Sequence, residues 1–533
     1  MKSVYLETMG CQMNVLDSEL VMGQLRRLGY APTGDMLKAD VVLLNTCSVR
    51  DHAEQKALSR LGALKKPKAA RNNMVVGVIG CMAERDPDGI FSKMPHVDLV
   101  CGPGELNKVP ALIEEVLTNR ERAIALAQSL SRRSTPVQRA LEFDSVEALD
   151  LSREPDPQER VLQAYIRVQR GCDKFCTFCV VPFTRGPERS RPPKQIVEEA
   201  KMLADRGARE VTLLGQTVNS YVNQEESRPV RFAELLSRVA AVDGIDRVRF
   251  VTSYPGDWDE EIFQVMRDEP KIARYLHIPA QSGSNAVLKR MRRVYTAESY
   301  IELMDKARSY LPDLAIASDL IVGFCGETEE DHQKTVELMK RCRFHRVFVF
   351  KYSPRPNTVA DKREPDDIPD AVKRRRNHEL LQVQESMSLE ANRAMVGRNV
   401  DVLVEGFSKA ALKAQQAEQT RGEEVTWRRS DQLVGRTIRD EIVVFNGSPE
   451  DIGRITGVTI EAATALTLHG SLTAPSGIAN PLRPAGANGN VDTSARASQT
   501  PDRDAATGSH NAATPVDHGE SGDGGSISLP IIG

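Results

Sequence analysis

The first part of the chain alternates short apolar runs with amphipathic segments. Runs of strand length fall at residues 4–8, 41–45, 74–80 and 97–100. Between the first two, apolar residues recur at helical spacing: Leu20, Val21, Leu25 and Leu28. Ser18 precedes them as a candidate N-cap. Strands that alternate with helices are typical of a parallel sheet. The pattern therefore predicts an N-terminal parallel α/β domain over residues 1–117.

A second and longer alternation predicts a barrel over residues 158–390. It follows residues 118–157, which we interpret as a linker because their centre is rich in Ser and Arg. The predicted strands lie at residues 164–169, 210–214, 247–251, 274–278, 315–322 and 347–351. The intervening segments are long enough for helices, for example over 194–205 and 297–310. Six such units predict an incomplete parallel (β/α)6 barrel, with its chemistry at the C-terminal ends of the strands.

The last part of the chain changes character twice. Short strands broken by glycines over residues 391–472 predict a small all-β barrel. Residues 473–533 contain no aromatic residue and are rich in Gly, Ala, Ser, Pro and Asp. Such a segment buries too little surface to offset the cost of ordering, so we predict a disordered tail. The fold class is thus α/β, with a small β domain and a disordered tail appended.

Composition limits the class of protein without identifying it. Of 533 residues, 40% are hydrophobic and 27% are charged, as in globular proteins in water. No apolar run approaches the roughly 18 residues of a membrane span. The N-terminus resembles neither a signal peptide nor a transit peptide, which predicts a cytoplasmic protein without a membrane partner. The nine cysteines are then expected to be reduced, so metal or cluster ligation explains them better than disulfides do.

Three cysteines stand in one short segment directly after the first predicted barrel strand. Cys172, Cys176 and Cys179 have the spacing C-x3-C-x2-C. Iron–sulfur clusters are normally held by four cysteines, so three thiolates leave one iron of a four-iron cluster open to another ligand. A zinc knuckle is the alternative, but zinc motifs usually contain a second cysteine pair, and none follows closely here. We therefore favour a cluster with an open iron.

Three further cysteines follow successive strands of the predicted N-terminal sheet. Cys11, Cys47 and Cys81 each stand just past the end of a strand. Because the carboxyl ends of parallel strands meet in one crevice, we expect their thiols to converge. The alternative is that they are buried core cysteines, which would be expected within strands or on helix faces. Cys101 also follows a strand, so spacing alone leaves it open as a fourth member.

Basic residues gather around the Cys172 segment. Six Lys or Arg residues stand between Gln163 and Pro193, against two acidic ones. They are Arg167, Arg170, Lys174, Arg185, Arg189 and Arg191. Phosphate-rich partners are attracted to such patches with little sequence preference, so we interpret this one as a contact for nucleic acid. Two further basic runs stand at 289–293 and 373–376. The alternative to a nucleic-acid contact for these runs is a solvated helix face.

Together the cysteine motifs resemble those of the radical S-adenosylmethionine (SAM) methylthiotransferase family. The N-terminal ones are Gly10-Cys11-Gln12-Met13-Asn14, Asn45-Thr46-Cys47-Ser48-Val49-Arg50 and Gly80-Cys81-Met82-Ala83. The run from Arg170 to Gly186 is similar to the family's radical SAM core, and the last β module resembles a TRAM domain, a small RNA-binding barrel. The resemblance covers roughly residues 1–470. The Cys179–Gly186 and Gly215–Tyr221 segments are most similar to members that act on N6-isopentenyladenosine in tRNA.

The resemblance implies two [4Fe-4S] clusters. One, on Cys172, Cys176 and Cys179, would bind SAM and, with an electron from an external donor, cleave it to a 5′-deoxyadenosyl radical. That radical would take hydrogen from C2 of the adenine. The other, on Cys11, Cys47 and Cys81, would deliver sulfur that comes from an external source, and a second SAM would supply the methyl group. The family uses three cysteines here, which leaves Cys101 as a bystander.

Further contacts are also implied. Phe178 stands where the family places an aromatic near the adenine of SAM, although packing beneath the loop is an equal interpretation. Other residues expected near SAM are Gly215, Gln216, Gly323 and Glu327; many radical SAM enzymes have an acidic residue in place of Gln216. The segment 277–284 is expected to line the substrate cavity. Contacts to the tRNA anticodon stem-loop are expected from Arg185, Arg189, Arg191, Arg428 and Arg429. Cys325 and Cys342 are interpreted as structural.

Two other functions stay open from the sequence. A sister methylthiotransferase would act on threonylcarbamoyl-adenosine in tRNA, or on an aspartate of a ribosomal protein, with the same two triads. An iron–sulfur RNA-binding protein without enzymatic activity would need only one closed cluster. The paired triads argue against the non-enzymatic protein, and the two segments named above favour isopentenyladenosine.

Overall fold

The computed structural model describes residues 2–48, 51–127, 149–150, 153, 161–225, 228–421 and 431–473, except for the side chains of residues 51–52 and 416–421. The predicted tail and most of the predicted linker lie outside these ranges. In the ranges described, no helix is both long enough and apolar enough to cross a membrane.

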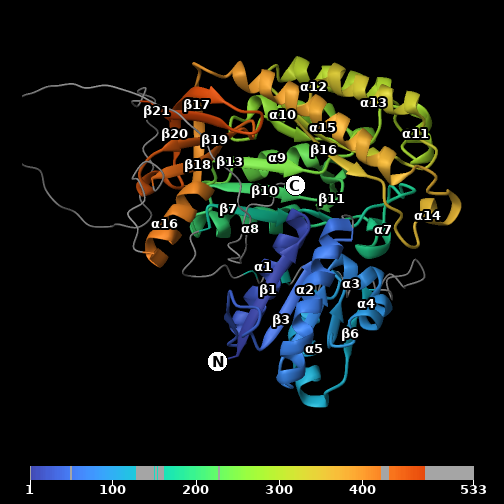
Figure 1. The fold of residues 1–533 in the computed structure, drawn as a ribbon. Helices are drawn as coiled ribbons and strands as arrows, with labels where there is room; N and C mark the ends of the chain where they lie inside the picture. The colour runs from blue at the N-terminus through green and yellow to red at the C-terminus, as the bar shows by residue number, and fades with distance from the viewer. Residues whose placement is uncertain are drawn as a thin grey trace, which may run out of the picture. The chain divides into compact units, whose positions relative to one another are not determined.

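Six strands form the N-terminal parallel sheet, in the order β2-β1-β3-β4-β5-β6. They are β1 (Ser3–Met9), β2 (Ala31–Pro32), β3 (Val41–Thr46), β4 (Val75–Ile79), β5 (Leu99–Cys101) and β6 (Ala123–Ala125). The helices of this domain are α1 (Gln12–Arg27), α2 (Asp51–Ala70), α3 (Cys81–Arg85), α4 (Pro87–Lys93) and α5 (Val109–Asn119) (Figure 1). Every residue of β3 and β4 is buried, as expected for a parallel sheet covered on both faces. The sheet continues to residue 125, past the predicted boundary at 117.

Helix α1 begins earlier than the hydrophobic pattern indicates. Its N-cap residue is Cys11, and no side chain caps its first turn. Ser18 is instead buried inside the helix, where its hydroxyl accepts hydrogen bonds from Thr8 (2.7 Å) and Asn45 (2.9 Å). The predicted N-cap was wrong because Ser18 serves a tertiary contact to two strands and not the helix terminus.

The second domain is an incomplete barrel of parallel strands, which confirms the predicted architecture (Figure 1). Its strands are β7 (Gln163–Arg167), β10 (Glu210–Leu214), β13 (Arg247–Val251), β14 (Tyr275–His277), β15 (Ala315–Val322) and β16 (Arg346–Lys351). A parallel bridge between Val248 and Ile272 joins the sheet β13-β10-β7 to the sheet β14-β15-β16. The main helices are α8 (Pro193–Asp205), α9 (Phe232–Ala240), α10 (Glu260–Asp268), α12 (Ala297–Tyr310), α13 (Glu329–Cys342) and α15 (Asp370–Arg393).

Smaller elements connect these units. They are β8 (Gln169–Arg170), β9 (Arg189–Ser190), β11 (Val222–Glu225), β12 (Arg228–Arg231), α7 (Val181–Thr184), α11 (Asn285–Arg290) and α14 (Val359–Arg363). The pair β8–β9 is antiparallel, and it closes the base of the segment that carries Cys172, Cys176 and Cys179.

The C-terminal domain is a closed five-stranded barrel in the order β17-β18-β19-β21-β20. Its strands are β17 (Asn399–Phe407), β18 (Gln432–Thr437), β19 (Ile442–Asn446), β20 (Ile455–Ala463) and β21 (Leu468–Leu472). A helix, α16 (Lys409–Arg421), follows β17, although the sequence pattern predicted only strands here. Its run of Ala, Lys and Gln residues has high helix propensity, a signal that the glycine-broken strands on either side obscured.

The turn between β18 and β19 packs against the N-terminal ends of the barrel strands. Arg249 donates to the carbonyl of Thr437 (3.0 Å) and lies 3.1 Å from the carboxylate of Asp440. The backbone N–H of Arg274 donates to the carbonyl of Ile438 (3.0 Å). Burial opposes ionisation of Asp440, but its arginine neighbours outweigh burial and hold its pKa below the usual value. The barrel interior is therefore bounded at this end by the C-terminal domain.

Candidate active site

A cavity of about 430 Å³ occupies the interior of the incomplete barrel. Five cysteines contribute to its wall: Cys11, Cys47, Cys172, Cys176 and Cys179. The opposite end of the cavity is reached by Arg436 and Asp440 of the C-terminal domain. Two cysteine motifs that are more than 120 residues apart in the sequence thus face one space. The convergence follows from topology, because both motifs stand at the C-terminal ends of parallel strands.

The segment with Cys172, Cys176 and Cys179 is fixed at its base and in its middle. A side chain at Gly171 would place its Cβ 2.0 Å from the carbonyl oxygen of Pro187, and φ is +72° there, so only glycine fits. The hydroxyl of Thr177 donates to the carbonyl of Arg290 (2.9 Å), and its backbone N–H donates to that of Met291 (3.1 Å). These contacts hold the three thiols at one end of the cavity.

The surroundings of these thiols fit an iron–sulfur cluster. Burial raises the pKa of Cys172 to about 11 and that of Cys179 to about 12, so the bare thiols are neutral and metal binding would have to ionise them. Arg293 donates from Nη1 to the sulfur of Cys176 (3.2 Å). Its guanidinium lies over the rings of Tyr254 and Tyr295, 5.3 and 5.5 Å from their centroids. The site therefore combines three thiols with a cation that favours their ionised form.

Three of the residues expected near SAM line the same cavity: Phe178, Gly215 and Gln216. The ring of Phe178 also packs edge-on against Phe324, at 6.3 Å between centroids. Its position is therefore compatible both with a contact near SAM and with packing beneath the loop. Gly215 and Gln216 follow β10 directly, beside the side chain of Gln169. The Oε1 atom of Gln169 accepts a hydrogen bond from the backbone N–H of Thr217 (3.2 Å), which fixes the path of the chain after Gln216.

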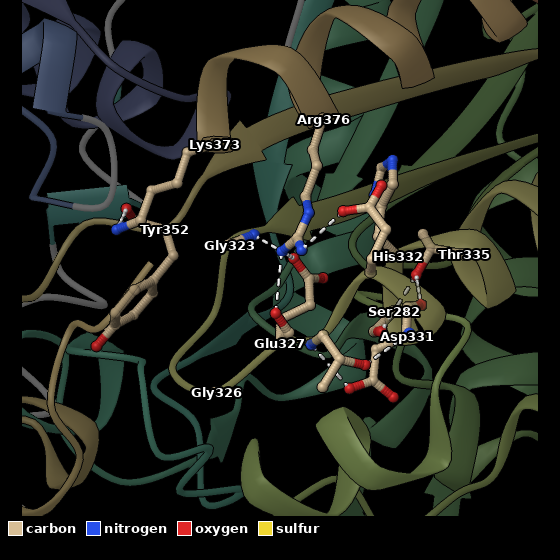
Figure 2. A network of polar contacts seen from close by, with 12 residues as sticks. Ser282, Gly323, Gly326, Glu327, Asp331, His332, Thr335, Tyr352, Lys373 and Arg376 are labelled. Atoms are coloured by element: carbon tan, nitrogen blue, oxygen red, sulfur yellow. Dashed lines mark hydrogen bonds and ion pairs between the residues drawn. The ribbon is translucent and has the colours of Figure 1, made fainter. Parts of the chain in front are cut away.

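Gly323 and Glu327, the other two residues expected near SAM, are not among the residues that line the cavity. Figure 2 shows Glu327 between the backbone of Gly323 and the side chain of Arg376. The carboxylate accepts from the N–H of Gly323 (2.6 Å) and from Arg376 (2.8 Å). Glu327 and Arg376 are both buried, and burial raises the pKa of Glu327. This carboxylate thus closes the loop after β15 onto α15, and it does not line the cavity.

Cys11, Cys47 and Cys81 come from three successive strand exits, as the sequence predicted. Cys11 precedes α1, Cys47 follows β3, and Cys81 is the first residue of α3. A Cβ on Gly10, where φ is +155°, would lie 2.6 Å from Cβ of Cys47, so glycine permits the close approach of these two segments. Asn14 lies between the segments, since its amide accepts from Cys11 (3.2 Å) and donates to Asn45 (2.9 Å).

The thiols of this triad differ in their electrostatics. A hydrogen bond with Cys47 is the main cause that lowers the pKa of Cys11, to about 6, against the effect of burial. Burial raises the pKa of Cys81, while Arg185 acts in the opposite sense. The set of three thiols with a nearby guanidinium fits a second cluster, in which thiolates are the usual ligands.

The other cysteines are buried away from the cavity. Cys101, at the end of β5, lies with its sulfur 3.2 Å from the carbonyl oxygen of Glu105. Cys325 and Cys342 belong to apolar clusters of the barrel domain. None of these three residues lines the cavity, which agrees with interpreting them as structural.

The basic patch around the Cys172 segment is largely internal, which corrects the interpretation of two tRNA contacts. Arg185 is 4% exposed and pairs with Asp17 (2.9 Å), while Arg191 is 3% exposed and pairs with Glu199 (2.8 Å). Arg167 joins the same network through the other oxygen of Asp17 (2.8 Å). Guanidinium groups held in this way are not available to phosphates. Arg189 is half-buried in β9, and Arg428 and Arg429 lie outside the described residues.

Each of the two other basic runs contains both inward-facing and exposed side chains. Lys373 and Arg376 face inward from α15, and only Arg374 and Arg375 are exposed there. In the run 289–293, Arg293 reaches Cys176 as described above. Sequence reasoning noted that run but did not connect it to the cysteines, because the contact spans 117 residues.

A histidine–aspartate pair inside the barrel was also missed. His277 at the end of β14 and Asp319 in β15 both line the cavity, with Nε2 and Oδ1 3.0 Å apart. Phe348 from β16 packs edge-on against the His277 ring, at 6.0 Å between centroids. The signal that was available is Asp319 itself, a carboxylate within the mostly apolar run of β15.

Comparisons with known proteins agree with this three-part organisation. Residues 3–102 match the family described as "Uncharacterized protein family UPF0004". Residues 166–339 match the Radical SAM superfamily, and residues 423–473 match the TRAM domain. The fold, the cavity and the matched families define a radical SAM enzyme.

Whole-chain relatives make the assignment more specific. A tRNA-2-methylthio-N(6)-dimethylallyladenosine synthase of Rhodopirellula baltica is 46% identical over 88% of this chain and 95% of its own length. One of Thermoanaerobacter sp. is 40% identical over 88% and 92%, respectively. Among solved structures, the radical SAM methyltransferase TsrM of Kitasatospora setae is 14% identical, with a TM-score of 0.45 over 66% of this chain and 73% of that one. The chain belongs to the family of tRNA-2-methylthio-N(6)-dimethylallyladenosine synthases.

Proposed function

We propose that this protein methylthiolates C2 of N6-isopentenyl (dimethylallyl) adenosine next to the anticodon of tRNA. The product would be 2-methylthio-N6-isopentenyladenosine. The observation that carries the proposal is the single cavity that cysteines of both triads line. A reaction that needs both hydrogen abstraction and sulfur delivery at one carbon requires the two centres to face the same substrate. The family membership supports the choice of tRNA.

Cys172, Cys176 and Cys179 would hold the [4Fe-4S] cluster that binds SAM. Bound there and reduced by an external donor, the cluster supplies one-electron cleavage of SAM, and with it hydrogen abstraction from a carbon that polar reagents barely touch. The protein's own contribution is to orient and to exclude water. Phe178, Gly215 and Gln216 line the space beside the triad, so they would position SAM. Arg293, which donates a hydrogen bond to the sulfur of Cys176, would compensate the negative charge of that thiolate once it holds iron.

Cys11, Cys47 and Cys81 would hold the second cluster and present the sulfur. Cys11 and Cys47 reach the cavity wall, while Cys81 is buried and does not line the cavity. The low pKa of Cys11 leaves a thiolate ready to bind iron near neutral pH. The sulfur source that recharges the site lies outside this chain.

The interior of the barrel would receive the flipped base. Bases of single-stranded loops leave their stack at modest cost, which suits the anticodon loop. His277 and Asp319 offer hydrogen-bonding groups to the base, and Phe348 offers an apolar face to the isopentenyl chain. The TRAM domain would hold RNA backbone outside the cavity, where Arg189, Arg428 and Arg429 remain proposed contacts.

Mass spectrometry of tRNA nucleosides tests this proposal in cells. Deleting the gene should remove 2-methylthio-N6-isopentenyladenosine and leave N6-isopentenyladenosine to accumulate in its place, because the preceding modification does not depend on this enzyme. Reintroducing the wild-type gene should restore the methylthio nucleoside. If the deletion instead removed a methylthiolated threonylcarbamoyl-adenosine, the substrate assignment would be wrong.

A further inference from the structure

Arg185 connects the radical SAM core to the cysteines of the N-terminal domain. It stands six residues after Cys179, at the C-terminal end of α7. Helix α7 packs against α3, which begins at Cys81. The guanidinium also reaches α1, the helix that begins after Cys11, through its bond to Asp17. The short segment of the core that ends in Arg185 thus contacts both α3, which begins at Cys81, and α1, which begins directly after Cys11.

Asp17 holds Arg185 in one orientation. Its carboxylate is completely buried, and each oxygen accepts from a different arginine. Oδ1 accepts from Arg167 (2.8 Å) and Oδ2 accepts from Nη2 of Arg185 (2.9 Å). A buried carboxylate with both oxygens engaged has no freedom to turn, so the remaining N–H groups of Arg185 point in a fixed direction.

The other terminal nitrogen of Arg185 lacks a partner. Nη1 is buried and makes no hydrogen bond to any residue that the structure describes. Helix α7, whose C-cap residue is Arg185, packs against α3, whose first residue is Cys81. A buried, unsatisfied donor of this kind is costly. Its position beside the triad indicates an anionic acceptor there.

We infer that Arg185 is a positioning residue for the second triad, with Nη1 directed at the anionic group that Cys11, Cys47 and Cys81 hold. This inference rests on the proposed second cluster. A donated hydrogen bond and a buried positive charge stabilise the more reduced, more negative state of a cluster and so raise its reduction potential. Since Arg185 and Cys179 share one short segment, the same residue also fixes the spacing of the two triads.

The test isolates the second triad. In a protein with Cys172→Ala, Cys176→Ala and Cys179→Ala, iron reconstituted anaerobically can bind only to the N-terminal cysteines as a cluster. Adding Arg185→Gln should speed the loss of this iron to a chelator by about ten- to a hundredfold, as expected for the loss of a hydrogen bond to a charged group. The reduction potential, followed by electron paramagnetic resonance, should fall. Arg185→Lys should give an intermediate result. Lysine keeps the positive charge but lacks the second terminal nitrogen of the guanidinium, so it cannot bind Asp17 and the cluster at the same time.

Two controls separate this role from a purely structural one. Arg191→Gln removes another buried arginine of the same ionic region, whose partner is Glu199, and the N-terminal iron should then be retained. In the reciprocal background, Cys11→Ala with Cys47→Ala and Cys81→Ala, Arg185→Gln should leave the iron of the core triad in place, which shows that the chain still folds.

The outcomes are distinct. If iron retention and the reduction potential are unchanged in Arg185→Gln, the inference about Arg185 is wrong, but the proposed second cluster is not contradicted. Equal losses in Arg185→Gln and Arg191→Gln, or loss of core iron in the reciprocal background, would also overturn it, because they indicate a general structural effect. If the parent triple variant holds no iron at all, the proposed second cluster itself fails.

Discussion

Replacing Cys172 by Ala should abolish reductive cleavage of SAM while the N-terminal triad keeps its iron. Without Cys172 the core segment offers two thiols, Cys176 and Cys179, which cannot hold a four-iron cluster in a SAM-binding state. Reconstituted wild-type protein should contain about eight irons per chain if both clusters have four, and the variant about four. Formation of 5′-deoxyadenosine, measured by liquid chromatography, should fall to the level of a control without enzyme.

Cys342→Ala provides the matched control for this experiment. Cys342 is completely buried in the apolar cluster of the barrel domain, away from the cavity. The variant should retain all its iron and should still cleave SAM. Continued formation of 5′-deoxyadenosine by the Cys172 variant would refute the assignment of this triad to SAM.

The second large effect is expected from Cys11→Ala, which should separate SAM cleavage from product formation. The core triad is intact in this variant, so 5′-deoxyadenosine should still form. The remaining N-terminal thiols, Cys47 and Cys81, cannot hold the sulfur-bearing cluster, and methylthiolated nucleoside should be undetectable by mass spectrometry. The iron content should drop by about half.

Cys101→Ala tests whether the N-terminal site uses three cysteines or four. Its thiol faces the carbonyl of Glu105, so its loss should leave both iron content and methylthiolation intact. Methylthiolated product from the Cys11 variant, or loss of iron from the Cys101 variant, would contradict the ligand set.

The strands and the positions of the cysteine motifs at strand ends could be predicted from the sequence because their signals are local. Strand β3 begins with four consecutive apolar residues and β4 is apolar except for one glycine, as is typical of buried parallel strands. Each cysteine motif stands next to a strand end. Topology then brings the motifs together, since parallel strands deliver their C-terminal ends to one side.

What the sequence could not reveal depends on partners far along the chain. Arg185 looks like an exposed phosphate contact in a basic segment, but its partner Asp17 stands 168 residues away, and nothing local marks the pair. The same holds for Glu327, whose partner Arg376 lies 49 residues away on α15. Charged residues are usually exposed, so a composition argument places them at the surface until their ion pairs are known.

The most direct test of the account uses purified, reconstituted protein with SAM, a reductant and three anticodon stem-loop RNAs. These RNAs carry N6-isopentenyladenosine, threonylcarbamoyl-adenosine or unmodified adenosine at the same position and are otherwise identical. Mass spectrometry should find a methylthio group only on the isopentenyl RNA, together with 5′-deoxyadenosine and S-adenosylhomocysteine. Methylthiolation of the threonylcarbamoyl RNA, or none on the isopentenyl RNA while SAM is cleaved and both clusters are present, would contradict the account.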